Sequence, residues 1–431
     1  MVMAAAPRLS TPAPASSGHA GHRDTGIDVV RALCVLGVVL LHAVMVGVTV
    51  SETGPVFENA SDGTSWIAPL SWLLQVMPLF FVIGGFSGLL AYRRLRARGG
   101  SATAFVAGRV HRLLRPALFT VGAVGVALAV LTVLGVAPDL IAVAGFRYGQ
   151  PLWFLGVFLL CQALLPALVA LHERAPLGTI AVLATAAVAV DVLRAVTGTD
   201  AVGFLNLAFV WLTMQQLGFL LADGRVDALR RRTRVTIGIG ALGVLVALFL
   251  IGAYSPDLIA NINPPTCALL LVGLIHTNLF SLYRAHIGRL SRRRPVAAFT
   301  AFVTRRTMTI YLWHMPVLLA MAGATALVAL LGGFTLPALD STEWWAARPL
   351  WLLTAVVLTA MVAVRVDRFE NHPSPQATSS RRRLAVGTVL GLTGVVLLLV
   401  LGTTVSTAAL AVLLLVAALR LAGRTGRPVL A

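Results

Sequence analysis

The sequence contains no lysine, and charged residues of either sign are scarce. All 34 basic side chains are arginine, only 16 side chains are Asp or Glu, and charged residues make up 12% of the 431-residue chain. An ordinary soluble domain has about 25% charged residues, so this composition excludes one. The three cysteines, Cys34, Cys161 and Cys267, all lie in apolar runs. We therefore expect small buried side chains there rather than disulfides or metal ligands.

Long apolar runs dominate the chain instead, with 58% hydrophobic residues and a mean hydropathy of +0.89. Runs of about 20 apolar residues are long enough to cross a bilayer as helices. They are continuous rather than alternating, so strands are not expected. We predict an all-α polytopic integral membrane protein with ten spans and a C-terminal transmembrane hairpin, about twelve spans in total. The runs lie at about 29–50, 68–91, 116–137, 152–171, 178–198, 203–222, 235–253, 266–283, 307–332, 347–365, 384–401 and 405–421.

Composition divides the chain into five parts. The N-terminal stretch is rich in Ala, Pro, Ser and Gly and has no apolar signal-peptide core, so we predict a disordered tail. Around Gly402 the last two runs either are joined by a tight turn, which gives a hairpin, or form one long tilted helix. The parts are a cytoplasmic tail (1–26), a ten-span domain (27–370), a basic cytoplasmic linker (371–383), the hairpin (384–422) and a second cytoplasmic tail (423–431).

The arginines alternate between the connections of these spans. Basic clusters fill every second connection, whereas the intervening ones are acidic and hold only Arg147 and Arg348. By the positive-inside rule the basic side is cytoplasmic. We therefore predict a multi-pass plasma-membrane protein with both termini inside the cell. The net charge of +18 is explained by this orientation, and a nucleic-acid partner is not expected.

Two ionisable residues interrupt the first apolar run. Arg31 and His42 are eleven residues apart, which is three helical turns plus about 20°, so both lie on one stripe about 16 Å apart. Arg31 lies at the start of the span and His42 well inside it. An ionisable side chain at membrane depth is costly and is usually functional. The stripe is therefore the first candidate for a site.

Other polar side chains lie within the remaining apolar runs. A glutamine can simply join two helices, and an aromatic side chain can belong to an interface belt. A histidine from another span, together with the stripe, nevertheless predicts a polar cavity open to the cytoplasm. The candidates for its lining are Trp153, Gln215, Gln216, His276, Tyr311 and His314.

The loop 93–115 is the most basic connection. Arg109 and Arg112 fall at helical spacing just before the third span. We predict an interfacial amphipathic helix there. It lies either on anionic lipid or beside an anion site that faces the cytoplasm.

This set of residues suits one kind of chemistry. The chain has no HxxxH metal pair, no P-loop and no serine nucleophile elbow. A histidine can take and return a proton near neutral pH. Arginines can hold the phosphates of a nucleotide-bearing donor. A lone histidine base is enough for acyl transfer when the donor is an activated thioester.

The chain resembles the membrane-bound acyltransferase family 3 over residues 24–365. The resemblance depends on Arg31 and His42 at the family's Arg-x10-His spacing, and on four further motifs. Ten spans are also typical of the family. Where the family signature often carries Ser or Thr, this chain has Gly84, and 384–421 lies outside the match. The motifs are MPLFFVIGGFSG (77–88), GRVHRLLRP (108–116), PLWFLGVFLL (151–160) and MTIYLWHMP (308–316).

The resemblance implies an O-acyltransferase of the cell envelope that transfers an acyl group, often acetyl, from acyl-CoA as co-substrate and has no permanently bound cofactor or metal. His42 and Arg31 are then the catalytic residues, and Arg109, Arg112 and Trp153 bind the donor. Gln215, His276, Tyr311 and His314 are candidates for the cavity. Acceptors in the family include carbohydrates, lipids and macrolide-type natural products.

Two other functions fit the same residues. A transporter or flippase for a metabolite or lipid-linked sugar also uses deep polar residues and kinked helices, but its flux needs no thioester. A noncatalytic membrane partner is a weaker alternative, since it gains nothing from buried histidines. A mixed function, moving an acyl group across the membrane to an outer acceptor, combines the first two.

Overall fold

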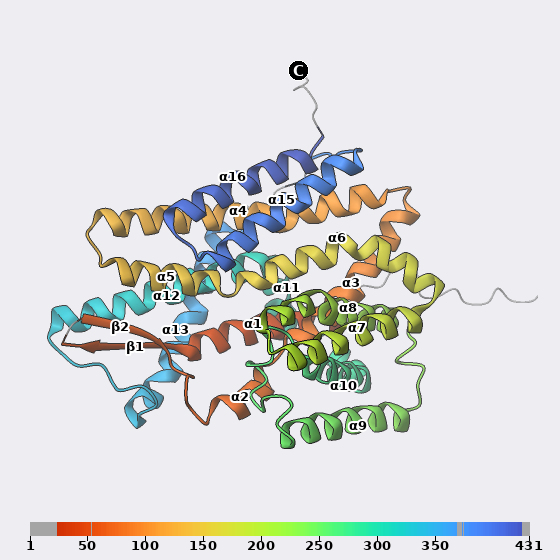
Figure 1. The fold of residues 1–431 in the computed structure, drawn as a ribbon, viewed down its shortest axis with the longest axis horizontal. Coiled ribbons are helices and arrows are strands. Elements are labelled where there is room, and N and C mark those ends of the chain that lie inside the picture. Colours follow the sequence, from red (N-terminus) through yellow and green to blue (C-terminus); the bar gives the residue numbers. More distant parts are fainter. Residues whose placement is uncertain (1–23, 53, 369–372, 374, 425–431) are drawn as a thin grey trace, which may run out of the picture.

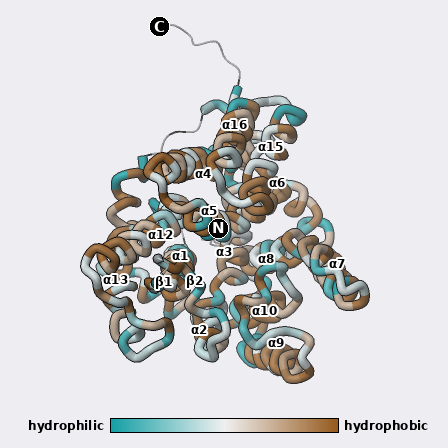
Figure 2. The backbone as a smooth tube through the Cα atoms, turned by 60° about the vertical axis from the view of Figure 1, so that its left-hand side comes forward, coloured by the Kyte–Doolittle hydropathy of each residue, from teal (hydrophilic) through white to brown (hydrophobic). Residues whose placement is uncertain are grey.

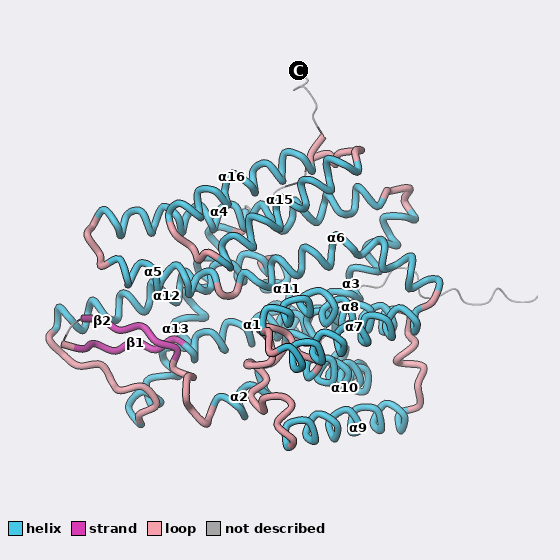
Figure 3. The backbone as a smooth tube through the Cα atoms, viewed as in Figure 1, coloured by secondary structure: helices cyan, strands magenta, loops and turns pink. Residues whose placement is uncertain are grey.

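The computed structural model describes residues 24–424 except 53, 369–372 and 374, and this part of the chain is almost entirely helical (Figures 1 and 3). It contains 12 candidate spans long and apolar enough to cross a membrane. The predicted all-α polytopic class is therefore confirmed. The elements are α1 (Thr25–Met45), β1 (Val46–Ser51), β2 (Gly54–Asn59), α2 (Ile67–Leu74), α3 (Met77–Ala97), α4 (Ala102–Val133), α5 (Pro138–Gly149), α6 (Leu152–Arg174), α7 (Pro176–Thr197), η1 (Asp200–Leu205), α8 (Asn206–Ala222), α9 (Arg231–Leu250), α10 (Ala268–Leu290), α11 (Arg294–Arg305), α12 (Thr307–Gly332), α13 (Thr342–Val366), α15 (Arg381–Val400) and α16 (Val405–Ala422).

The first span ends earlier than predicted. Helix α1 stops at Met45, and the chain continues as an antiparallel hairpin in which Val46 pairs with Asn59 and Ser51 with Gly54. The run Val46–Ser51 is rich in β-branched residues, which favour strands. Gly54 has φ +126°, a conformation that glycine adopts easily at the turn. The prediction of helix throughout was wrong at this point, and the hairpin decides what surrounds His42.

The basic segment after α3 does not form a separate interfacial helix. Ser101 caps α4 by accepting a hydrogen bond from the Ala104 amide, and α4 then runs unbroken from Ala102 to Val133. Its 32 residues span about 48 Å, more than the hydrocarbon core of a bilayer. Arg109 and Arg112 therefore lie in the first three turns of one long helix, so the predicted helix leading into the third span is present, but it is continuous with that span.

The last two runs form a helical hairpin, so the tight-turn alternative is correct. Gly402 adopts φ +73° between α15 and α16, and Thr404 and Thr407 form a capping box at the start of α16. The hairpin packs closely on α4: a Cβ at Gly391 would lie 2.5 Å from Leu114 Cδ1. Small residues allow such close approach of helices.

The predicted domain boundaries can be placed only in part. Asp24 caps α1 and Thr25 starts it, so the last residues of the predicted N-terminal tail belong to the first span. The rest of that tail (1–23), the boundary between the ten-span domain and the linker (369–372 and 374) and the final residues (425–431) lie outside the described residues.

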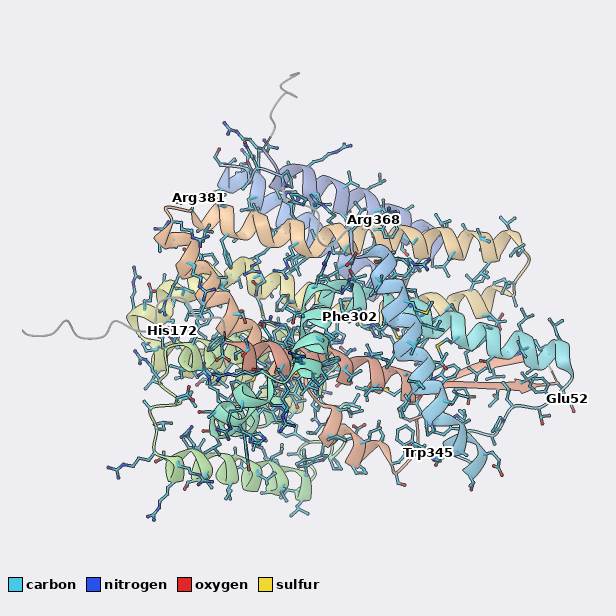
Figure 4. All side chains as sticks on the ribbon, turned by 180° about the vertical axis from the view of Figure 1, so that it is seen from behind. Glu52, His172, Phe302, Trp345, Arg368 and Arg381 are labelled. Atoms are coloured by element: carbon cyan, nitrogen blue, oxygen red, sulfur yellow. The ribbon has the colours of Figure 1, made fainter. Side chains whose placement is uncertain are left out.

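Helix α1 lies in the interior of the bundle, whereas α7, α9 and α13 lie at the periphery (Figure 2). Buried side chains of α1 such as Ala32, Val35 and Val39 belong to the same core cluster as Ile83 of α3 and Leu312 of α12. The stripe of α1 is therefore surrounded by protein rather than by lipid. Glu52 and Trp345 lie toward one end of the molecule, and His172 and Arg381 toward the other (Figure 4).

Candidate active site

Two histidines from distant parts of the sequence meet at the centre of the bundle. His42 lies in the last turn of α1 and His314 in α12. His314 Nε2 is 3.3 Å from His42 Nδ1, and the ring centroids are 4.9 Å apart. His314 is completely buried, whereas His42 is partly accessible. The structure thus joins two residues that the sequence separates by 272 positions.

The hydrogen bonds fix the tautomers of both rings. His42 Nδ1 lies 2.9 Å from the Val38 carbonyl, and His314 Nδ1 bonds to the Tyr311 carbonyl. A carbonyl can only accept, so we assign a hydrogen to each Nδ1. His314 Nε2 then carries a lone pair that accepts from His42 Nδ1–H, which Val38 and His314 share. The lone pair of His42 is therefore on Nε2, the nitrogen left to act as a base.

The histidine pair lies deep in the protein. His314 is seven residues from the start of α12 and eighteen from its end, or about 10 Å and about 27 Å. The hairpin β1–β2 continues from α1 beside α12, where Val48 contacts Ala322 and Ala326. Helix α1 ends at Met45, before the far end of α12, and the hairpin β1–β2 covers the end of α1 there.

Three arginines surround a cavity of about 230 Å³, here called the arginine cavity, whose basic lining residues are Arg31, Arg109 and Arg112. Arg31 donates to Asp28 (3.0 Å) and to Ser87 of α3 (2.5 Å). Within the described residues neither Arg109 nor Arg112 has an acidic partner, and Arg109 lies 4.8 Å over the Phe105 ring. Three guanidinium groups with one carboxylate leave an excess of positive charge, which favours an anion such as a phosphate.

The arginine cavity continues in both directions. On one side it shares Arg112 and Thr304 with a cavity of about 450 Å³, the rim cavity, which reaches Ser291 and Arg305. On the other side it shares Phe80, Phe154, Thr307 and Met308 with a cavity of about 120 Å³ that extends to His42. We call the latter the aromatic cavity.

A fourth space, the hairpin cavity, lies between β1–β2, α5 and α12. It has a volume of about 450 Å³ and shares His42 and Met45 with the aromatic cavity. The four cavities therefore form a row: the rim cavity, the arginine cavity, the aromatic cavity and the hairpin cavity. We call this row the passage. His42 lies at the junction of the aromatic and hairpin cavities, so it can be approached from two directions.

Contacts between helices fix the positions of the aromatic side chains in the walls of the aromatic cavity. Trp153 stacks on Trp211 with ring centroids 5.5 Å apart. The Tyr311 hydroxyl donates to the Pro151 carbonyl at 2.7 Å. Both Trp153 and Tyr311 line this cavity together with His42. Trp153, expected beside the donor-binding arginines, thus lies farther along the passage and nearer to the histidine.

Of the expected cavity residues, Tyr311 lines a cavity, whereas His314 contacts His42 without lining any of the four cavities, and Gln215 and His276 lie elsewhere. Gln215 is buried and donates to the Cys161 carbonyl of α6 at 3.2 Å, which joins two helices. His276 lies on α10, and its Nδ1 has no hydrogen-bond partner among the described residues. Neither residue lines any of the four cavities. The neighbouring Gln216 donates to the Leu168 carbonyl and contacts His172.

Sequence reasoning missed several residues of this passage. Asp28 could have been recognised, because it lies three residues before Arg31 and can pair with it on one helix face. Ser87 and Arg305 gave no such signal, because only tertiary packing brings α3 and α11 to the arginines. Arg147 was noticed only as an arginine on the acidic side, yet it lines the hairpin cavity.

An ionic network ties helices together at the basic end of the molecule. Asp223, just after α8, accepts from Arg93 of α3 at 2.5 Å and bonds to His172 of α6 at 3.0 Å. Burial raises the pKa of the Asp223 carboxyl, but the bonds from Arg93 and His172 outweigh it and hold the pKa below its ordinary value. Within the described ranges no three His, Cys, Asp or Glu side chains gather as metal ligands.

Comparison with known proteins adds one finding. The sequence profile of the family 3 acyltransferase domain matches residues 24–366, which include α1 to α13 and every residue of the passage. No curated protein and no solved structure matches the chain.

Proposed function

Since this chain belongs to the acyltransferase family 3 and is a membrane acyltransferase, we propose that it moves an acyl group from a coenzyme A thioester to an acceptor hydroxyl at His42. The observation that carries this proposal is the row of four cavities with His42 at a junction. Donor and acceptor can approach such a residue from opposite directions without competing for the same space.

The arginine cavity suits the phosphates of the donor. Arg31, Arg109 and Arg112 supply fixed positive charge, and the rim cavity beyond them has room for a nucleotide. The stripe of α1 separates Arg31 from His42 by about 16 Å. The extended arm of a coenzyme A thioester then follows the narrow aromatic cavity, and its acyl carbon arrives beside His42. We place the donor's approach on the side of the chain predicted to be cytoplasmic.

His42 then acts as a general base through Nε2. It takes the proton of the acceptor hydroxyl while the oxygen attacks the thioester carbonyl and forms a tetrahedral intermediate. When the C–S bond breaks, the proton on Nε2 passes to the leaving thiolate, so the ring returns neutral. During the reaction His42 is an imidazolium, and His314 Nε2, 3.3 Å away, accepts its Nδ1–H. A transient acyl group on His42 is the less favoured alternative.

The first test compares two intramembrane histidines. We expect His42→Ala in lipid nanodiscs to lose acetyl transfer from labelled acetyl-CoA by at least about 100-fold, the contribution of a general base. His276→Ala is the matched control, because His276 is also a membrane histidine but lines none of the four cavities. Undiminished transfer by His42→Ala, or an equal loss in both variants, contradicts this role.

A further inference from the structure

The hairpin cavity has walls of two different characters. Its long sides are apolar and come from α5 and α12, with side chains such as Leu140, Ile141, Leu319, Leu327 and Leu330. Its volume of about 450 Å³ lies within the range of small-molecule sites. It is also the larger of the two spaces that meet at His42, and it lies beyond the donor route. It is therefore the space left for the acceptor.

The polar groups of the hairpin cavity are gathered at its inner end. Asn59 pairs with Val46, four residues after His42, and so lies at the end of the hairpin nearest to that histidine. Arg147 and Gln150 come just before Pro151, whose carbonyl accepts from Tyr311, one turn before His314. These groups therefore lie toward the end of the cavity that holds His42.

The opposite end of the cavity is apolar. Leu140 lies in the first turn of α5, and Leu330 in the last turn of α12, far from His314. A free carbohydrate has hydroxyls around its whole circumference, and these would lose their water against such walls without gaining partners. Each hydroxyl that is buried without a hydrogen-bond partner weakens binding. A ligand with one polar end and a hydrocarbon body avoids this cost.

We infer that the acceptor is a predominantly apolar alcohol: its hydroxyl-bearing polar end lies beside His42, Arg147 and Gln150, and its hydrocarbon body fills the space between α5 and α12. This inference rests on the proposed function, and it names the acceptor class. It excludes a free water-soluble sugar. It also excludes an ordinary outer-leaflet phospholipid, whose polar end would point the opposite way.

Gly323 of α12 allows this cavity to be filled. It lines the hairpin cavity, and a Cβ built there meets no heavy atom within 4 Å. Gly323 is itself exposed, so Gly323→Phe adds a ring at the wall of the cavity without a clash at the backbone. Gly243→Phe is the matched control, because Gly243 lies on the peripheral helix α9, is exposed, and also has nothing within 4 Å of a built Cβ.

The binding arm uses the full chain in nanodiscs and a dodecyl glucoside that carries a photoreactive diazirine on its alkyl chain. We expect it to label α5 or α12, and we expect unlabelled dodecyl glucoside but not methyl glucoside to compete. Gly323→Phe should reduce this labelling at least tenfold, and Gly243→Phe should leave it unchanged. Labelling outside α5 and α12, labelling indifferent to Gly323→Phe, or equal competition by methyl glucoside overturns the inference.

In the turnover arm, the protein in nanodiscs receives acetyl-CoA labelled in the acetyl group. It also receives either the lipid extract or the water-soluble extract of the cells that make the protein. His42-dependent label in the organic phase supports an apolar acceptor. His42-dependent label confined to the aqueous phase leaves the acyltransferase standing and overturns this acceptor class. If neither phase is labelled and no thiol is released, the proposed function fails, and the acceptor assignment fails with it.

Discussion

The hydrogen bonds of two histidine rings decide which nitrogen can take a proton. Because the Val38 and Tyr311 carbonyls each face an Nδ1, the free lone pair of His42 is on Nε2. His314 does not line the aromatic cavity or the hairpin cavity, so in the proposed reaction we expect it to act through His42 as a positioning residue. Its lone pair holds the His42 ring and stabilises the imidazolium.

We predict that His314→Ala lowers kcat by about 10–100-fold, while KM for acetyl-CoA stays within about twofold, because the donor does not reach this ring. His314→Gln should recover part of the rate, since its amide oxygen can accept from His42 Nδ1–H. Steady-state kinetics in nanodiscs give both constants. A rise in KM with unchanged kcat, or no recovery with Gln, contradicts the positioning role.

Arg109 gives a second prediction at this scale. It lines the arginine cavity without an acidic partner among the described residues, so its charge is available to a phosphate. Hydrogen bonds to charged groups contribute about 1.5–3 kcal/mol, so Arg109→Ala should weaken coenzyme A binding by about 10–100-fold. Isothermal titration with coenzyme A measures this directly.

Arg98 is the control for Arg109. It lies at the exposed C-terminal end of α3 and lines none of the four cavities. Arg98→Ala should bind coenzyme A like the unchanged protein. If both variants lose affinity equally, the basic segment acts through its general charge at a lipid surface, and the anion site is contradicted.

At the scale of elements, ionic contacts fix the positions of helices α3, α6 and α8 relative to one another. Asp223 links α3, α6 and the end of α8 through Arg93 and His172. Because the pKa of Asp223 is lower in the folded protein than in the unfolded chain, the ionised form of this carboxyl stabilises the fold. This stabilisation is present at neutral pH and is lost as the pH falls through the lowered folded pKa.

We therefore predict that Asp223→Asn lowers the free energy of unfolding at pH 7 by about 1–2 kcal/mol. The difference from the unchanged protein should shrink as the pH approaches 3. Thermal unfolding followed by tryptophan fluorescence from pH 7 to pH 3 measures both. Glu173→Gln is the control, because Glu173 lies 3.5 Å from the same Arg93 but is largely exposed. A difference that persists at acid pH contradicts the ionic explanation.

The elements also show where sequence patterns are sufficient and where they fail. Hydropathy predicted all twelve spans, because a membrane helix must be apolar along its whole length. It could not predict β1–β2, because the apolar run from α1 continues through Val50 without interruption. It also placed the start of the third span at Pro116, although α4 begins at Ala102 and continues through this internal proline.

At the scale of the whole molecule, the passage is a product of tertiary packing. The stripe of Arg31 and His42 was predictable, because helical periodicity within one span places both side chains. The partners Ser87 and His314 come from α3 and α12, and no local pattern pairs them with α1. Gln215, by contrast, is as polar as the passage residues but bonds between helices away from it.

The arrangement of cavities also gives the passage a direction. The arginine cavity is lined by Arg109 and Arg112 in the first turns of α4. The hairpin cavity is lined by β1–β2, which leads to Glu52 at one end of the molecule (Figure 4). Coenzyme A thioesters are charged and do not cross a bilayer. Under the proposed function we therefore expect the donor to reach His42 from the face that carries the arginines.

The most direct measurement is thiol release from acetyl-CoA added outside sealed vesicles of opposite orientation. We predict turnover with inside-out vesicles, which expose the arginine face, little with right-side-out vesicles until they are permeabilised, and none from either with His42→Ala. Equal turnover from both faces of sealed vesicles, or turnover that survives the loss of His42, would contradict the account.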